Sequence, residues 1–176
     1  MLRAPFSQEL ISIDKWDVIV VGAGAAGLMT CVELPGNLNV LLLNRNTSKR
    51  SSSRWAQGGI ASVVRPEDSF ALHVEDTLKA GDDLCDVSAV EMLVKEAPGC
   101  VERLQNLGMI FDQTSDKLST TLEAAHSCRR VLHVKDRTGR ALVEVLEDHI
   151  ENKENILHCR GAVSYTHLTL PTTPYV

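Results

Sequence analysis

The segment from residue 17 to residue 43 constrains the fold more than any other part of the chain. It begins with DVIVV (17–21), a run of apolar, mostly β-branched residues that is typical of a strand buried on both faces of a parallel sheet. GAGAAG then opens a small and apolar stretch that stops at Pro35 and Gly36, which predicts a helix over 22–34. NVLLL (39–43) is the next buried strand. A right-handed crossover would make these strands parallel, with the helix N-terminus at their carboxyl edge.

Three glycines form a G-x-G-x-x-G pattern directly after the first strand, where dinucleotide binding requires it. Gly22 would permit the tight turn, Gly24 would let a pyrophosphate approach the backbone, and Gly27 would let helix and strand pack closely. Free N–H groups and the helix dipole favour negative charge there. The sequence therefore predicts a Rossmann-like α/β domain with a parallel sheet that binds a dinucleotide.

The end of the second strand leaves the identity of the dinucleotide open. A carboxylate for the ribose hydroxyl is expected about 20 residues after the glycines, but the chain has Asn44 and Arg45 there. Asparagine can still hydrogen-bond a hydroxyl, and arginine can meet a phosphate or stack on adenine. NADP and FAD both fit these residues.

Residues 46–59, NTSKRSSSRWAQGG, are too long for an ordinary connection and show no helical or strand period, so we expect a functional loop. Helices follow it. One is expected to be capped near Ser69 and to end at Gly81, a second to begin at about Asp86, and a third to begin at Pro98 and end near residue 108.

The last predicted elements are a strand, a helix and another strand. RRVLHV (129–134) and ENILHC (154–159) have strand composition, and Asp136 and Thr138 are expected to cap a helix that begins at Gly139. The residues expected on the inner face of that helix are Leu142, Val145, Leu146, His149 and Ile150.

The composition argues against several partners. Hydrophobic residues at 44% and charged residues at 23% are typical of a globular domain, whereas aromatics at 4% are too few for a nucleic-acid stacking platform. A net charge of -5 gives no electrostatic reason to bind nucleic acid or an anionic membrane. No apolar segment approaches the roughly 18 residues of a membrane span. We therefore expect neither a nucleic-acid nor a membrane partner.

The cysteines and the two ends of the chain suggest a compartment and domain limits. Five scattered cysteines without C-x-x-C spacing predict reduced thiols and no zinc site. Residues 1–16 form a lead that resembles neither a secretory signal nor a transit peptide, and 17–162 would be the binding domain. Residues 163–176 carry no charge. They are either foreign to the fold or an edge strand broken by Pro171 and Pro174.

Blocks after GAGAAG resemble one protein family in their order and spacing. They are SSSRWAQGGIAS (51–62), HVEDTLKAGDDLCD (73–86), TLEAAHS (121–127) and RVLHVKDRTGR (130–140). Together they resemble the L-aspartate oxidases, part of the flavoprotein family of succinate dehydrogenase and fumarate reductase flavoprotein subunits. The resemblance runs from about Asp17 to Ala162. It covers only the N-terminal part of such a protein, so the C-terminal part of the FAD-binding domain and most of the capping domain are expected to be missing.

The resemblance implies FAD as the cofactor, bound without a covalent link. Ala23 to Ala26 would face the pyrophosphate, and Arg45 would lie near the adenosine half. Ser52 stands where dehydrogenase and reductase relatives carry the histidine that is joined to the flavin, and a hydroxyl cannot replace imidazole in that bond. The residues implied in cofactor binding are Gly22, Ala23, Gly24, Ala25, Ala26, Gly27, Arg45, Ser52, Ser53, Arg54, Trp55, Ala56, Gln57, Gly58 and Gly59.

Glu123 is the residue that the resemblance assigns to substrate orientation. The succinate and fumarate relatives carry an aromatic residue and two glycines in the matching loop, whereas aspartate oxidases carry glutamate. A carboxylate in a poorly hydrated site favours the ammonium that distinguishes aspartate from succinate. With succinate it would stay unpaired, at a cost of about 2–5 kcal/mol, or roughly 30- to several-thousand-fold in selectivity. Without the resemblance, Glu123 would be an ordinary loop or capping acid.

Five further polar residues have structural and functional interpretations. His126 and Ser127 either support Glu123 or bond only within their own loop, and His73 is expected at a helix start. His133, in a strand, is expected to be a satisfied core histidine. Cys128 stands where aspartate oxidases commonly have His, Arg or Pro, a departure that the sequence does not explain.

The implied activity is oxidation of L-aspartate to iminoaspartate with O2 or fumarate as acceptor, the first step of de novo NAD biosynthesis, with the product passed to quinolinate synthesis. No catalytic residue and no metal ligand is assigned, because the family's substrate-site arginines and histidines lie beyond the resemblance. These 176 residues alone are therefore expected to be inactive. A succinate dehydrogenase or fumarate reductase type of flavoprotein and a non-catalytic dinucleotide-binding remnant stay open as alternatives. The expected compartment is the cytoplasm, with a plastid also open.

Overall fold

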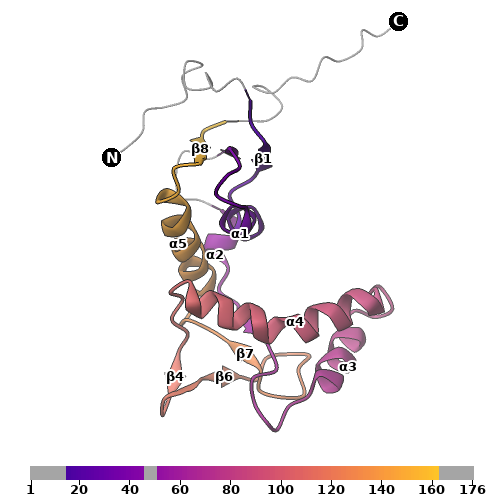
Figure 1. Ribbon diagram of the computed structural model, residues 1–176. Coiled ribbons are helices and arrows are strands. Elements are labelled where there is room, and N and C mark those ends of the chain that lie inside the picture. The colour runs from indigo at the N-terminus through magenta and orange to yellow at the C-terminus, as the bar shows by residue number, and fades with distance from the viewer. Residues whose placement is uncertain (1–14, 46–50, 163–176) are drawn as a thin grey trace, which may run out of the picture. The chain divides into compact units, whose positions relative to one another are not determined.

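The computed structural model describes residues 15–45 and 51–162 (Figure 1). These residues group into two compact units. The first unit combines the chain up to Trp55 with the chain from Val143 onward, and the second unit is Ala56–Leu142. Most of the predicted lead, part of the predicted loop and the uncharged tail lie outside the described residues.

A parallel sheet is the centre of the first unit. Its strands are β1 (Val18–Val21), β2 (Val40–Asn44) and β8 (Ile156–Arg160), in the order β1-β2-β8. Both neighbouring pairs are parallel. The three strands predicted from the sequence are confirmed, and so is the parallel arrangement of the first two.

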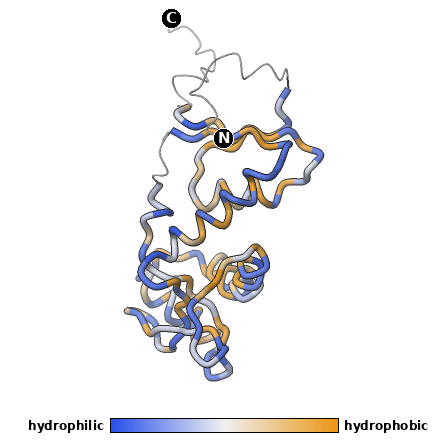
Figure 2. Tube along the Cα trace, turned by 90° about the vertical axis from the view of Figure 1, so that its left-hand side faces the viewer, coloured by the Kyte–Doolittle hydropathy of each residue, from blue (hydrophilic) through white to orange (hydrophobic). Residues whose placement is uncertain are grey.

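β2 is buried on both faces, whereas β1 is not. Every residue from Val40 to Leu43 is at most 3% exposed, and Figure 2 shows the hydrophobic residues running along the strands of this sheet. In β1, however, Ile19 is 48% and Val21 is 64% exposed. The prediction of two buried faces is therefore wrong for β1, because no described segment covers the face that carries these two side chains.

α1 (Ala25–Glu33) is the helix predicted after the glycine turn, and it buries Leu28 and Cys31 completely. The partial negative charge at the C-terminus of this helix is compensated by a lysine far away in the sequence. The Lys153 ammonium donates to the carbonyl oxygens of Cys31 at 3.2 Å and Val32 at 2.7 Å. A cation at a helix C-terminus is favourable, so Lys153 fixes this end of α1.

α5 (Thr138–Glu151) precedes β8, and its inner face differs from the prediction. The buried residues are Thr138, Gly139, Val143, Leu146, Glu147 and Ile150. Two of the five predicted positions are among them, two are half-buried, and His149 is exposed. The buried face of the helix is rotated from the predicted one because it includes Glu147, which pairs with Arg54. A prediction that places only hydrophobic residues on the inner face leaves this acidic residue out. The predicted capping by Thr138 is wrong, because its hydroxyl accepts the N–H of Val134 at 3.1 Å instead.

α3 (Phe70–Ala80) in the second unit begins and ends where the sequence predicts. The Ser69 hydroxyl accepts the N–H of Leu72 at 3.2 Å, which satisfies a donor of the first turn. Gly81 follows the last turn and donates its N–H to the carbonyl of Thr77. Both predicted ends of this helix are confirmed.

α4 (Val87–Asn106) is one helix where the sequence predicts two. It begins after Asp86, whose side chain accepts the N–H of Ala89 at 3.0 Å, as predicted. Pro98 lies inside the helix and does not begin a new one. An interior proline removes one main-chain donor and crowds the carbonyl four residues before it, so packing must hold the helix together across this position. The buried residues lie on both sides of it and continue one face through the helix: Val90, Val94, Val101 and Leu104.

Short strands complete the second unit. They are β3 (Ile60–Ala61), β7 (Val131–Leu132) and β6 (Thr120–Thr121), which form an antiparallel sheet in the order β3-β7-β6, and β4 (Gln113–Thr114) and β5 (Lys117–Leu118), which form a hairpin. The strand predicted over 129–134 is confirmed only at its centre.

Three smaller findings bear on the sequence-based expectations. α2 (Ser52–Trp55) is a helical turn inside the loop for which no regular structure was predicted. All five cysteines are free, as expected. No helix in the described ranges is long and apolar enough to cross a membrane.

Candidate functional site

The turn after β1 has the geometry expected of a phosphate-binding loop. Gly22 has φ of 104°, a left-handed conformation that favours glycine, and donates its N–H to the carbonyl of Leu43 at 2.8 Å. A Cβ atom at Gly27 would lie 1.9 Å from the carbonyl oxygen of Gly22. The turn and the close helix packing predicted for the first and third glycines are therefore confirmed.

The N-terminus of α1 is open toward a ligand. Gly24 is the N-cap residue and has no side chain to cap the helix. The N–H of Ala25 donates to the Ser53 hydroxyl at 3.0 Å, and the N–H groups of Ala26 and Gly27 have no acceptor within the helix, as at every helix N-terminus. These donors and the helix dipole favour an anionic group such as a pyrophosphate.

Ser53 connects the start of α1 with the segment that follows β2, and both were predicted to bind the cofactor. Besides its bond to Ala25, its hydroxyl would lie 3.2 Å from a Cβ atom at Gly24, so it rests directly on the glycine turn. The sequence assigns Ser53 to the loop around the flavin but does not predict this contact. The loop that follows β2 thus returns to the turn that precedes α1.

Arg54 forms ion pairs with two acidic residues of α5. Its guanidinium contacts the carboxylate of Glu144 at 2.5 Å and that of Glu147 at 3.5 Å, and its side chain is only 12% exposed. This ion pair holds the α2 turn against α5. The geometry gives Arg54 a structural role, and its contact with a cofactor stays a prediction.

The other predicted cofactor residues differ in their exposure. Ala23 is buried beneath the turn, and Arg45 is exposed beyond the carboxyl end of β2, the sheet edge at which the glycine turn begins. Ser52, Trp55, Ala56, Gln57 and Gly58 are exposed. Gly59 is constrained by packing, because a Cβ there would lie 2.3 Å from the carbonyl oxygen of Leu132.

Glu123 lies in the second unit, in the loop between β6 and β7. Its carbonyl accepts the N–H of His126 at 3.2 Å, and Ala125 has φ of 68°, a left-handed conformation that is unfavourable for alanine. The Glu123 side chain is exposed, and among the described residues none pairs with its carboxylate. The poorly hydrated surroundings predicted for it are not found in this part of the chain.

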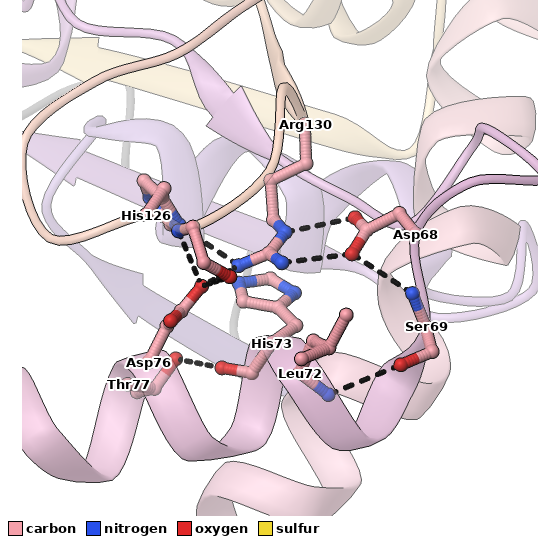
Figure 3. A network of polar contacts seen from close by, with 9 residues as sticks. Asp68, Ser69, Leu72, His73, Asp76, Thr77, His126 and Arg130 are labelled. Carbon is pink, nitrogen blue, oxygen red and sulfur yellow. Dashed lines mark hydrogen bonds and ion pairs between the residues drawn. The ribbon is translucent and has the colours of Figure 1, made fainter.

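A buried arginine lies at the base of this loop (Figure 3). Arg130 is fully buried and forms a bidentate pair with Asp68, with Nε–Oδ2 and Nη2–Oδ1 distances of 2.8 and 2.7 Å. Its Nη1 atom contacts Asp76 at 2.5 Å and Nδ1 of His126 at 3.2 Å. Asp76 also accepts the N–H and the hydroxyl of Ser127 at 2.7 and 2.8 Å.

The network shifts the ionisation of its members. Hydrogen bonds from Arg130 hold the pKa of Asp68 below its ordinary value against the effect of burial. For Asp76, burial would raise the pKa, but bonds from Ser127 and Arg130 lower it to about 2. Burial lowers the pKa of His73, and the Arg130 charge and His126, whose ring centroid is 5.6 Å away, lower it further. Both carboxylates are therefore charged at neutral pH.

This network was not predicted from the sequence. Arg130 was expected only as part of a strand, and no role was expected for Asp68 or Asp76. An arginine directly before the apolar pair Val131–Leu132 is the signal that could have found it, because a buried guanidinium requires acidic partners. His126 and Ser127, for which two interpretations were open, bond to this network, so their contacts extend beyond their own loop.

The remaining predicted polar residues take structural positions. His73 lies in the first turn of α3 and is buried, as expected for a helix start. His133 is half-buried rather than a core residue, and its Nε2 atom lies 3.7 Å from the Asp112 carboxylate. The Cys128 side chain makes a small contribution to the lowered pKa of the Asp68 carboxyl. In the ranges that the structure covers, no cluster of histidine, cysteine and acidic side chains could hold a metal ion.

The first unit thus has the βαβ order, the glycine turn and the open helix N-terminus of a Rossmann-type dinucleotide-binding protein. The family described as "FAD binding domain" matches residues 17–169. The chain belongs to this family, and its cofactor is FAD. The exposed donors of α1 and the glycine positions fit a pyrophosphate of this kind.

Curated proteins similar to this chain include L-aspartate oxidases. One from Nostoc sp. is 49% identical over 160 residues, which is 91% of this chain and 28% of that protein. Another from Synechocystis sp. is 42% identical over 176 residues, 90% of this chain and 32% of that protein. The chain therefore spans about a third or less of the length of these relatives.

Solved structures confirm the fold class. The Mycobacterium smegmatis Sdh1 complex in the apo form matches 83% of this chain and 27% of its own chain, with a TM-score of 0.77 and 30% identity. E. coli quinol fumarate reductase FrdA matches 83% of this chain and 26% of its own, with a TM-score of 0.78 and 26% identity. The predicted resemblance to this flavoprotein family is therefore confirmed.

Proposed function

We propose that this chain is the FAD-binding segment of an L-aspartate oxidase, which oxidises L-aspartate to iminoaspartate. The observation that carries the proposal is the similarity of 42–49% to proteins of that name over about nine-tenths of this chain. In this proposal the Glu123 carboxylate, which is exposed in the described part of the chain, would meet the ammonium of aspartate. The reaction removes two electrons and two protons from aspartate, and O2 would accept them as peroxide, or fumarate as succinate.

In this proposal the residues of the chain bind and orient rather than carry out the redox step. FAD, when bound, supplies the capacity to accept a hydride. The N–H groups at the start of α1 would hold its pyrophosphate, with Ser53 fixing the turn. Glu123 would attract the substrate ammonium and discriminate against succinate. A first step of NAD biosynthesis, with the imine passed to quinolinate synthesis, follows from this activity, and the free cysteines are consistent with the cytoplasm as its compartment.

A complete chain that carries this segment, purified with FAD, tests the proposal. Incubated with L-aspartate in air, it is expected to form one peroxide per aspartate consumed, and succinate is expected to give none. The 176-residue chain alone is expected to give no peroxide above a blank, because the rest of the substrate site lies in other parts of the relatives. Peroxide from the short chain would contradict that expectation.

A second candidate is a succinate dehydrogenase or fumarate reductase type of flavoprotein. The observation in its favour is the match to the Sdh1 complex and to FrdA. It predicts succinate oxidation by the complete chain without response to aspartate. Ser52 argues against it, because the residue joined to flavin in those relatives is expected to be histidine.

FAD is expected to dissociate when the holoprotein is denatured, because the Ser52 hydroxyl cannot form the histidine–flavin bond. The measurement is filtration after denaturation in acid or guanidinium, with flavin absorbance recorded in the filtrate. Nearly all the flavin is expected there. Flavin that remains with the denatured protein would contradict the prediction.

Gly27→Ala is expected to weaken FAD binding roughly 5- to 150-fold, since forcing a methyl group against packed backbone costs about 1–3 kcal/mol. The new Cβ would lie 1.9 Å from the Gly22 carbonyl oxygen and push the turn apart. Gly36→Ala is the matched control, because nothing lies within 4 Å of its Cβ position. Flavin fluorescence titrations of both complete-chain variants measure the effect. Equal affinities would show that the turn does not hold the cofactor.

A further inference from the structure

The loop that carries Glu123 contacts the buried network through two of its residues, His126 and Ser127. Within residues 122–127 the main-chain bond from His126 to Glu123 closes a turn, and Ala125 keeps an unfavourable left-handed conformation. Such a conformation persists only where the surrounding structure holds it. Two donors of Ser127, the residue that ends the loop, reach the same carboxylate oxygen of Asp76.

Asp76 is itself held in place. It lies in α3, and its Oδ2 atom also accepts a hydrogen bond from Nη1 of Arg130. The orientation of the Arg130 guanidinium is fixed, because its Nε and Nη2 atoms donate to the two carboxylate oxygens of Asp68. Asp68 in turn accepts the N–H of Ser69, the residue that caps α3. Charge-assisted and bidentate bonds of this kind fix geometry strongly, and Figure 3 shows how these side chains converge.

We propose that Asp76 is a positioning residue that fixes the 122–127 loop and thereby the place of the Glu123 carboxylate. The inference rests on the proposed function. Glu123 has no side-chain partner of its own in the described part of the chain, so its position is decided by the loop backbone. Without Asp76, both donors of Ser127 lose their acceptor, and the loop keeps only the contact between His126 and Arg130. Glu123 then spends less time where it meets the substrate ammonium.

The test uses a complete chain loaded with FAD and compares Asp76→Ala, Asp86→Ala and Glu123→Gln. Asp86 caps α4 in the same unit, so its loss disturbs a helix start without touching the loop. For Asp76→Ala we expect the KM for aspartate to rise roughly tenfold, with kcat and flavin content changed less than twofold, as for loss of a fixed charge-assisted contact. Amide hydrogen exchange in a peptide over 122–128 is expected to become roughly tenfold faster. Asp86→Ala is expected to change neither quantity.

Different results separate this inference from the proposed function. If Glu123→Gln loses selectivity for aspartate but Asp76→Ala keeps the wild-type KM, the positioning role is overturned and the proposed function stands. If Glu123→Gln keeps full selectivity, Glu123 has no substrate role and the positioning inference is overturned, whereas the proposed function is still decided by whether the complete chain oxidises aspartate. Should Asp76→Ala fail to fold, Ser127→Ala removes one of the two donors, and Asp76→Asn keeps one acceptor oxygen. Both variants are expected to raise the KM by a smaller factor, and wild-type values for both would overturn the inference.

Discussion

Replacing Arg130 by methionine is expected to lower the free energy of unfolding by about 3–5 kcal/mol, the range for removing one partner of a buried ion pair. The guanidinium is fully buried between Asp68, whose side chain is 1% exposed, and Asp76, which is 14% exposed. Without the guanidinium, the carboxylates of Asp68 and Asp76 would remain close together in a poorly hydrated environment with no cation to compensate their charges. Denaturant unfolding of the complete chain, monitored by circular dichroism, measures the loss.

The loss is expected to depend on pH. In the wild type, the lowered pKa values of Asp68 and Asp76 mean that their stabilisation is present above about pH 4 and is lost at lower pH, for Asp76 as the pH falls through about 2. In Arg130→Met the same carboxyls would prefer protonation. The difference between variant and wild type should therefore be largest near neutral pH and shrink toward pH 4.

Arg160→Met is the matched control for this prediction. Arg160 pairs with Glu151 at 3.0 Å, but both side chains are exposed, at 35% and 52%. Removing such a surface pair is expected to cost less than about 1 kcal/mol. A cost of that small size for Arg130→Met would contradict the role assigned to the network.

Glu123→Gln is expected to lower the preference for aspartate over succinate, measured as the ratio of kcat/KM values, by roughly 30-fold or more. The substitution keeps the size of the side chain and removes its charge, so the substrate ammonium loses its counter-ion and succinate no longer meets an unpaired carboxylate. We expect the lower end of the predicted range, because Glu123 is exposed among the residues described. Steady-state kinetics of the complete chain with each substrate give the ratio.

Glu91→Gln provides the matched control, since Glu91 is an exposed acid of α4 in the same unit. It should leave the ratio within about twofold of the wild type, because solvent screens a remote surface charge. An unchanged ratio in Glu123→Gln would remove the substrate role from this residue and favour the interpretation of an ordinary loop acid.

The features that the sequence predicted well depend on local chemistry. Gly22 and Gly27 have conformations and contacts that only glycine tolerates, and the ends of α3 follow from Ser69 and Gly81. Such signals act over a few residues, so they survive whatever the rest of the fold does. The parallel pairing of β1 with β2 follows in the same way from the connection between them.

The features that were missed depend on partners distant in the sequence. Pro98 stays inside α4 because buried side chains on both sides of it hold the helix together. Glu147 turns the inner face of α5 because Arg54 reaches it from α2. Arg130 is tolerated in the core, directly before β7, because Asp68 pairs with it from 62 positions away. Local propensity and periodicity contain no information on these pairs.

The central claim is that FAD held by this chain is reduced by L-aspartate, and flavin absorbance measured without oxygen tests it most directly. A complete chain that carries these residues, mixed with L-aspartate under anaerobic conditions, is expected to lose its absorbance near 450 nm, while succinate at the same concentration leaves it unchanged. Bleaching by succinate alone would contradict the claim and favour the dehydrogenase type. Bound flavin that neither compound bleaches would contradict it as well and leave a dinucleotide-binding protein without this activity.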